Sequence, residues 1–154
     1  MPAPMHSSLA QRGAPAPSAH AEAPVVHRLP VRVYWEDTDA GGIVFYANYL
    51  KYFERARTEW LRALGVHQQA LRERTGVQFV VTHAAMQYRA PARLDDALEV
   101  TVALRHTGRA SLALAQQARR EDTVLVDGEV RIGCVEAATL RPCRIPEEIL
   151  RVLP

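Results

Sequence analysis

The sequence predicts an α+β domain in which a curved antiparallel sheet of about five strands packs against one long helix. Three observations predict this class. One strand pattern precedes a long amphipathic helical pattern, four further strand patterns follow it, and short turn signals separate those four. Short turns favour antiparallel neighbours, and the apolar stripe of a long helix needs a sheet face to cover it.

The predicted domain covers residues 30–154 of the 154-residue chain. Residues 1–29 are rich in Pro, Ala and Ser and lack apolar periodicity, which predicts a disordered tail. The tail has no continuous apolar region typical of a signal peptide, and no later stretch approaches the roughly 20 apolar residues that span a bilayer. We therefore expect a cytoplasmic protein without stable membrane insertion.

Charge and cysteine content narrow the function classes. The net charge is +2 and arginines alternate with acids, a pattern that does not favour nucleic-acid binding. Cys134 and Cys143 show no CxxC spacing and the histidines are scattered, so the sequence predicts no metal site. In a reducing compartment, we expect both cysteines to be free thiols rather than a disulfide.

The N-terminal half of the domain contains the first strand, a loop and the long helix. Alternation of Val31, Val33 and Trp35 predicts a strand over Pro30–Glu36, and the turn-forming residues Asp37–Gly42 predict a loop. A helix is predicted from about Ala47, and Gly65 is positioned to cap its end. Its apolar stripe consists of Tyr49, Leu50, Phe53, Ala56, Trp60 and Leu64.

The C-terminal half is mostly strand. A short helix is predicted over His67–Gly76, and the chain can close with one helical turn. The four strands are predicted over Val77–Ala90, Ala97–Gly108, Arg109–Arg120 and Thr123–Ala137.

The stretch RVYWEDTDAGGIVFYANYLKYFERARTEWL resembles the signature of hotdog-fold acyl-CoA thioesterases of the 4-hydroxybenzoyl-CoA thioesterase superfamily. It is most similar to their Tol–Pal-associated branch. The resemblance continues in YRAPARLDDALEV, GRASL and RPCRIPEEI, so it covers roughly Pro30 to the end. It implies a hotdog fold, an acyl-CoA substrate, no cofactor apart from the coenzyme A of the substrate, and a homodimer or homotetramer with pockets at the subunit boundary.

The resemblance also implies site residues. The second acid of the DTD motif, Asp39, corresponds to the catalytic carboxylate, and the backbone N–H of Tyr46 to the group that polarises the thioester carbonyl. Asn48 and Tyr49 match the family's Asn–Tyr pair, and Arg109 matches a basic residue for a coenzyme A phosphate. The similar branch usually has His at position 46, which affects the expected acyl preference more than the reaction.

The residues themselves fit this chemistry. Thioester hydrolysis needs a nucleophile, which is a carboxylate or a water that it activates, and donors for the developing oxyanion. A helix N-terminus supplies such donors, and Gly41 and Gly42 allow backbone to approach a substrate. We expect Asp37 to shape the loop by accepting backbone hydrogen bonds.

Some assignments keep two alternatives. Glu54 points either into the substrate pocket or to an ion pair with Arg55 or Arg57. Tyr49, Phe53 and Trp60 are expected in the core, and Tyr46 at the site. Further candidates for phosphate binding are Arg89, Arg93 and Arg105.

Two other functions remain open at this stage. One is a non-catalytic module that binds acyl carrier protein or a partner in lipid metabolism, in which Asp37 and Asp39 are ordinary turn formers. The other is a hydratase or dehydratase, which is disfavoured because such sites pair a His with an acid and no His lies near DTDAGG.

Overall fold

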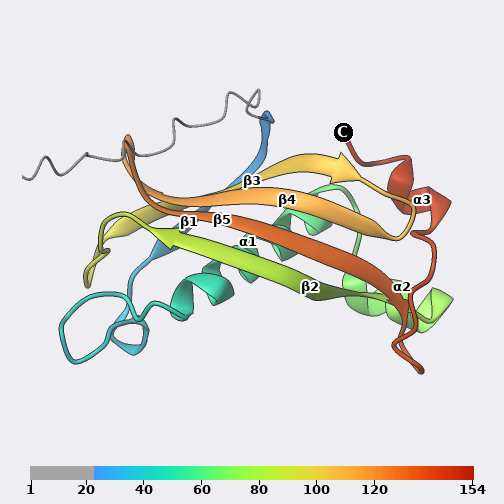
Figure 1. Cartoon of the computed structure of the whole chain (residues 1–154), viewed down its shortest axis with the longest axis horizontal. Coiled ribbons are helices and arrows are strands. Elements are labelled where there is room, and N and C mark those ends of the chain that lie inside the picture. Colours follow the sequence, from blue (N-terminus) through green and yellow to red (C-terminus); the bar gives the residue numbers. More distant parts are fainter. Residues whose placement is uncertain (1–22) are drawn as a thin grey trace, which may run out of the picture.

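The computed structural model describes residues 23–154, and the predicted tail at residues 1–22 lies outside them. Five strands form one antiparallel sheet in the order β1-β3-β4-β5-β2 (Figure 1). The elements in chain order are β1 (Val25–Arg32), the 3-10 turn η1 (Trp35–Asp37), α1 (Asn48–Ala63), α2 (Gln68–Thr75), β2 (Val77–Tyr88), β3 (Ala97–Thr107), β4 (Ser111–Arg120), β5 (Thr123–Glu136) and α3 (Glu147–Leu150).

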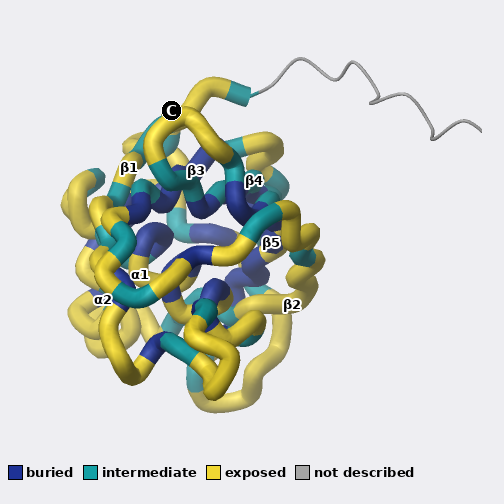
Figure 2. The backbone as a smooth tube through the Cα atoms, turned by 90° about the vertical axis from the view of Figure 1, so that its left-hand side faces the viewer, coloured by how far each residue is buried: buried dark blue, intermediate teal, exposed yellow. Residues whose placement is uncertain are grey.

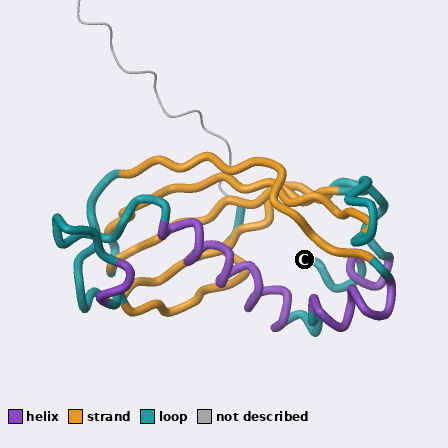
Figure 3. Tube along the Cα trace, turned by 90° about the horizontal axis from the view of Figure 1, so that it is seen from below, coloured by secondary structure: helices purple, strands orange, loops and turns teal. Residues whose placement is uncertain are grey.

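The long helix α1 lies against one face of the curved sheet (Figures 1 and 3). This is the predicted α+β architecture and the hotdog arrangement that the resemblance implied. Among residues 23–154, no helix is both long enough and apolar enough to cross a membrane.

The apolar stripe of α1 makes the centre of the core. Tyr49, Phe53, Ala56 and Trp60 are all at most 2% exposed, as predicted, and Figure 2 shows the buried segments between helix and sheet. Leu50 is 43% exposed, so its place in the buried stripe was predicted wrongly. The backbone of Gly65 has φ +83°, the left-handed conformation that ends the helix as expected.

The N-terminal boundary of the domain was predicted wrongly. β1 begins at Val25 and pairs with β3, so residues 25–29 belong to the sheet rather than to a tail that ends at residue 29. The strand also ends at Arg32 rather than at Glu36, because Trp35–Asp37 forms a 3-10 turn. The alternation of Val31, Val33 and Trp35 predicted one buried face through Trp35. Val33 is fully buried, but Trp35 is 80% exposed, so the buried face does not reach it.

The remaining elements follow the sequence patterns within one or two residues at each end. β2 to β5 are the four predicted strands, and α2 ends at Gly76, which adopts φ +71°. The short α3 is the predicted last helical turn. Both edge strands, β1 and β2, have one side without a neighbour among the described strands.

The contact between α1 and β5 requires a glycine. A Cβ at Gly128 would lie 2.2 Å from Cε2 of Phe53 and 3.0 Å from Sδ of Met86. The aromatic ring of α1 therefore occupies the space directly over the β5 backbone.

Gly128→Ala is expected to lower the free energy of unfolding by about 1–3 kcal/mol, since the added methyl group overpacks this contact. Gly133→Ala is the matched control on the same strand, because its Cβ would meet only the Thr82 methyl group, at 3.1 Å. Urea unfolding of both variants measures the difference. Equal stabilities would show that Phe53 moves aside without cost.

Candidate functional site

Residues 38–44, called the Asp39 loop below, form a small closed hairpin before α1. Thr38 and Val44 pair in an antiparallel bridge. Asp39 N–H donates to the carbonyl oxygen of Ile43 (2.9 Å), and Gly42 N–H donates to that of Asp39 (3.0 Å). The loop is therefore held by its own backbone, and the chain leaves it directly toward the helix.

The Asp39 side chain is exposed and only half engaged. Its Oδ1 accepts the Gly41 N–H at 2.8 Å and the Ile43 N–H at 3.4 Å. Its Oδ2 has no hydrogen-bond partner within residues 23–154. One oxygen thus fixes the orientation of the carboxylate while the other is free for a substrate or a water molecule.

Both glycines of the motif shape this loop. A Cβ at Gly41 would lie 3.1 Å from Oδ1 of Asp39, and Gly42 has φ +77°, which favours glycine. Their N–H groups are used inside the loop, by Oδ1 and the carbonyl oxygen of Asp39. The predicted approach of this backbone to a substrate remains a prediction.

Asp37 connects the end of the first strand region to the start of α1. The residue is only 5% exposed. Its Oδ2 accepts the Tyr34 N–H (2.8 Å), and its Oδ1 accepts the side-chain amide of Asn48 (3.0 Å). Its carbonyl oxygen accepts the Phe45 N–H (2.9 Å). The expected loop-shaping role of Asp37 is confirmed.

The bond to Asn48 was not predicted from the sequence. Asn48 is 7% exposed and lies behind the loop, where its amide contacts a carboxylate instead of an open cleft. Tyr52 also lies beside Asp37. Burial, and then the Asp37 carboxylate, raise the pKa of Tyr52, so its hydroxyl adds no second negative charge there.

The start of α1 presents an unpaired amide. Within residues 23–154, the N–H of Tyr46 has no hydrogen-bond acceptor, whereas the N–H of Asn48 donates to the Phe45 carbonyl oxygen (2.8 Å). The hydroxyl of Tyr88, at the end of β2, donates to the Tyr46 carbonyl oxygen (2.9 Å). The Tyr46 backbone is therefore positioned while its N–H stays open, as the oxyanion role requires.

Exposed aromatic side chains flank the Asp39 loop in the chain. The ring of Tyr46, which is 64% exposed, packs against Phe45 at a centroid distance of 4.8 Å and lies edge-on to Tyr88 at 6.3 Å. Tyr34 and Trp35 are also largely exposed. An apolar patch of this kind marks a surface that a ligand or another protein covers.

Two other predicted site residues make no hydrogen bond to the Asp39 carboxylate. Tyr49 belongs to the core, as expected, and its hydroxyl accepts the Ala92 N–H at 3.3 Å. Glu54 accepts the Thr58 hydroxyl at 2.8 Å and lines a cavity of about 110 Å³ between α1 and β2. Within residues 23–154 it forms no ion pair with Arg55 or Arg57, so that alternative is wrong.

Two of the arginine candidates for phosphate binding lie at different distances from the Asp39 loop. Arg109 follows β3 in the turn before β4, whereas the Asp39 loop contacts the segment that precedes β3. β3 has 11 residues, which span roughly 35 Å. The β3–β4 turn that contains Arg109 therefore lies at the opposite end of the sheet from the loop before α1 (Figure 1).

Arg93 is the near candidate. Its backbone pairs with Ile43 of the Asp39 loop, its side chain is exposed, and its guanidinium has no partner within residues 23–154. The neighbouring Asp96 carboxylate instead pairs with Arg120 (2.7 Å). From the sequence, Arg93 was only one of four candidates for phosphate binding. Its bridge to Ile43 joins residues 50 positions apart, so no local pattern indicated that it lies beside the Asp39 loop.

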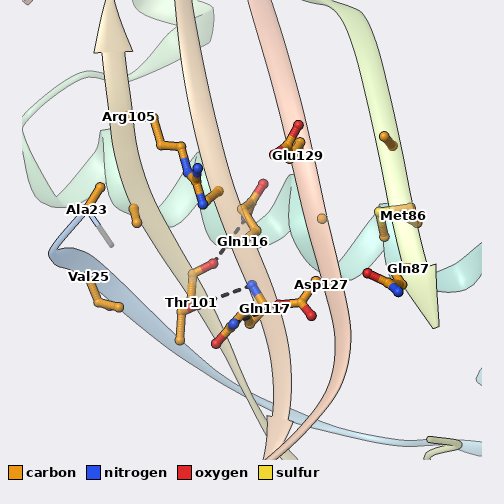
Figure 4. Close-up of a pocket in the computed structure, with 14 residues that line it drawn as sticks. Ala23, Val25, Met86, Gln87, Thr101, Arg105, Gln116, Gln117, Asp127 and Glu129 are labelled. Atoms are coloured by element: carbon orange, nitrogen blue, oxygen red, sulfur yellow. Dashed lines mark hydrogen bonds between the residues drawn. The ribbon is translucent and has the colours of Figure 1, made fainter. Parts of the chain in front are cut away.

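The described cavities do not contain the Asp39 loop. A cavity of about 370 Å³ lies on the face of the sheet that points away from α1 (Figure 4). Its polar walls bond to one another, Gln117 Nε2 to Asp127 Oδ1 at 2.7 Å and the Gln117 N–H to Thr101 Oγ1 at 3.2 Å. Asp39 lines neither this cavity nor the two smaller ones described on this protomer.

Several known proteins similar to this chain carry the name of a thioesterase. "Acyl-CoA thioester hydrolase YbgC" of Escherichia coli O6:H1 is 44% identical over 124 residues, which cover 80% of this chain and 92% of that protein. "Acyl-CoA thioesterase YbgC" of Haemophilus influenzae is 42% identical over 121 residues, or 79% and 89% of the two chains.

A solved structure agrees. The structure of a probable thioesterase from Bartonella henselae superimposes with a TM-score of 0.73 at 31% identity, covering 78% of this chain and 98% of that one. Residues 33–153 match the thioesterase-like superfamily. This range includes both the Asp39 loop and the open amide of Tyr46. The resemblance read from the DTDAGG block is thus confirmed, and the chain belongs to the thioesterase-like superfamily of hotdog-fold proteins.

Proposed function

We propose that this protein is an acyl-CoA thioesterase that uses Asp39 as nucleophile or general base and the Tyr46 N–H as oxyanion donor. The observation that carries the proposal is that a half-free carboxylate and an unpaired amide just before α1 occur in one short stretch of chain, which hydrogen bonds hold in a closed loop. The YbgC relatives, which carry the name of this activity, support it.

The reaction follows from these groups. Asp39 Oδ2 attacks the thioester carbonyl carbon or removes a proton from a water that does so. The developing oxyanion accepts the Tyr46 N–H, aided by the positive end of the α1 dipole. Direct attack expels the thiolate of coenzyme A and leaves an acyl–Asp39 anhydride, which a water molecule hydrolyses to the free carboxylic acid and the Asp39 carboxylate. In the general-base route the water itself adds to the carbonyl carbon before the C–S bond breaks. In both routes one proton of that water ends on the thiol of coenzyme A.

Arg93 is our candidate for a coenzyme A phosphate in the same protomer. Arg93 lies beside the Asp39 loop, and its guanidinium has no partner within residues 23–154. The planar guanidinium matches the geometry of a phosphate. Arg109 cannot contribute to this site from the same chain, since β3 separates them. It can do so only from a second copy.

A second copy also accounts for three surface features. Asp39 lies outside the described cavities, exposed aromatic residues flank its loop in the chain, and β2 has an edge without a partner among the described strands. Sheet edges and apolar patches of this kind are normally covered by another chain. We therefore propose a homo-oligomer in which the substrate cleft forms between subunits.

Asp39→Asn is expected to lower kcat for acyl-CoA hydrolysis by at least about 100-fold, because the variant loses the acid–base group. KM and thermal stability are expected to stay near the parent values, since the side-chain oxygen of the new amide can still accept the Gly41 N–H. Thiol release across acyl-CoA chain lengths gives the readout. Glu36→Gln, a change at an exposed acid three positions away, is the control. Near-full turnover of the Asp39→Asn enzyme would leave the non-catalytic binding module as the better explanation.

Asp37→Asn is expected to destabilise the fold by about 1–3 kcal/mol and to lower kcat, because the new amide faces either the Tyr34 N–H or the Asn48 amide, both donors. The double variant Asp37→Asn/Asn48→Asp restores one donor for each acceptor. It is expected to recover stability and turnover together. Recovery of stability without turnover would separate the Asp37 contacts from catalysis.

Arg93→Ala is expected to raise KM for acyl-CoA roughly 5-fold with little change in kcat, since it removes a ground-state phosphate contact. With an acyl-pantetheine substrate, which lacks the phosphates, the effect is expected to vanish. Arg141→Ala, at an exposed arginine without a side-chain partner within residues 23–154, serves as control. A KM effect that persists with acyl-pantetheine would place Arg93 elsewhere.

The Arg109→Ala variant tests whether Arg109 of one subunit contributes to the substrate site of a neighbouring subunit. Its KM is expected to rise in the same phosphate-dependent manner if Arg109 reaches a neighbouring subunit's site. Co-expressed Arg109→Ala and Asp39→Asn subunits are then expected to form mixed oligomers with some sites that combine intact Asp39 and Arg109. Unchanged KM would remove Arg109 from the site.

A further inference from the structure

The two cysteines lie against each other at the end of β5. Cys134 belongs to β5 and is fully buried, and Cys143 lies in the segment that follows β5 and is partly buried. Their Sγ atoms are 3.6 Å apart, and both are free thiols. Neither side chain has a part in the proposed hydrolysis.

The backbone holds the two thiols opposite each other. Val135 and Pro142 form an antiparallel bridge, which makes Cys134 and Cys143 the next facing pair. Cys143 N–H donates to the Cys134 carbonyl oxygen (2.9 Å), and Glu136 N–H donates to that of Arg141 (2.9 Å). Facing residues of a hydrogen-bonded antiparallel pair have a Cα separation of about 5.5 Å, which is within the range of a disulfide. Their Cβ separation of about 4.5–5.5 Å begins at the upper end of the Cβ range of a disulfide, so a crosslink requires side-chain rotation and a small approach of the two backbones.

We propose that Cys134 and Cys143 form a redox modification site, at which a hydroperoxide converts the two thiols into an intrachain disulfide. This inference does not depend on the proposed hydrolase activity. The site requires both residues, and the expected reducing compartment keeps them as thiols in the resting protein.

The surroundings assign a role to each sulfur. Burial, reinforced by the neighbouring Cys143, raises the pKa of the Cys134 thiol to about 12, and this thiol faces the carbonyl oxygen of Arg144 at 3.5 Å. Cys134 therefore stays protonated and shielded at neutral pH. Cys143, the more accessible sulfur, is the one that meets the oxidant.

The chemistry balances in two steps. The Cys143 thiolate attacks the O–O bond of the hydroperoxide and becomes a sulfenic acid, while the peroxide's other oxygen leaves as an alcohol or as water. The Cys134 sulfur then attacks Sγ of Cys143 and expels hydroxide, which takes the Cys134 proton and leaves as water. Two thiols lose two electrons and two protons, and the hydroperoxide is reduced.

The crosslink would join β5 to the segment that follows it, and both parts are hydrogen-bonded to the β3–β4 turn. Cys134 N–H donates to the carbonyl oxygen of Ala110 (2.7 Å), and Ile145 N–H donates to that of Arg109 (2.8 Å). The segment after β5, drawn in red in Figure 1, therefore already contacts the β3–β4 turn. A disulfide adds a covalent link between β5 and this segment, which stays hydrogen-bonded to the turn, and so fixes the segment that leads to α3.

The test oxidises the full-length protein with excess hydrogen peroxide, then alkylates free thiols and measures intact mass and peptide maps. We expect a loss of two hydrogens, no alkylated cysteine and one peptide pair that joins Cys134 to Cys143. The thermal midpoint is expected to rise by about 5 °C and to fall back after reduction with dithiothreitol.

Two variants separate this site from general oxidation. Cys143→Ser is expected to show neither mass loss nor thermal shift, and its buried Cys134 is expected to resist peroxide. Cys134→Ser is expected to accumulate a sulfenic acid at Cys143, which a 1,3-dicarbonyl reagent traps. If Cys134→Ser does not fold, the peptide map and Cys143→Ser still decide the question. Two alkylatable thiols after peroxide, oxidation of Cys143 beyond sulfenic acid without a crosslink, or a link between chains would overturn the proposal.

Discussion

The buried carboxylate of Asp37 is the contact on which the geometry of the candidate site depends. It accepts one hydrogen bond from the chain that leaves β1 and one from the first residue of α1, while its carbonyl oxygen accepts a third from Phe45. A charge this deeply buried is stable only because donors surround it. The chain on either side of the Asp39 loop is therefore fixed through this one residue, in addition to the hydrogen bonds within the loop itself.

The two acids of the DTD motif have different environments along one short stretch. The first acid of the DTD motif is buried and structural, whereas the second is exposed and half free. The packing of α1 on the sheet fixes the position of the helix start, since Phe53 sits directly over Gly128 of β5. The amide of Tyr46 therefore projects from a rigid frame, which is the condition for a preorganised oxyanion donor.

Most of the fold was predictable because its signals are local. The stripe of α1, the caps at Gly65 and Gly76 and the strands β2 to β5 each follow from residues within one element. β1 was misplaced because its start depends on pairing with β3, a partner distant in the chain. The alternation through Trp35 continued past the true strand end, where the Asp37 side chain closes a turn instead.

The candidate site was predictable only in part for the same reason. Asp39, the glycines and Tyr46 lie in one continuous motif, so their neighbourhood follows from the chain itself. The bond from Asn48 to Asp37 and the bridge from Arg93 to Ile43 join residues that are distant in sequence, and neither leaves a periodic signal. The distance between Arg109 and Asp39 became visible only once the direction of β3 was known.

The hydrogen bond from the Tyr88 hydroxyl to the Tyr46 carbonyl oxygen has a mechanical consequence. Tyr88 is the last residue of β2, an edge strand, and Tyr46 lies just before the helix. A sideways displacement of that edge is therefore transmitted through a single phenol to the peptide plane between Tyr46 and Ala47. The free border of the sheet and the backbone just before α1 are in this way mechanically linked within one chain.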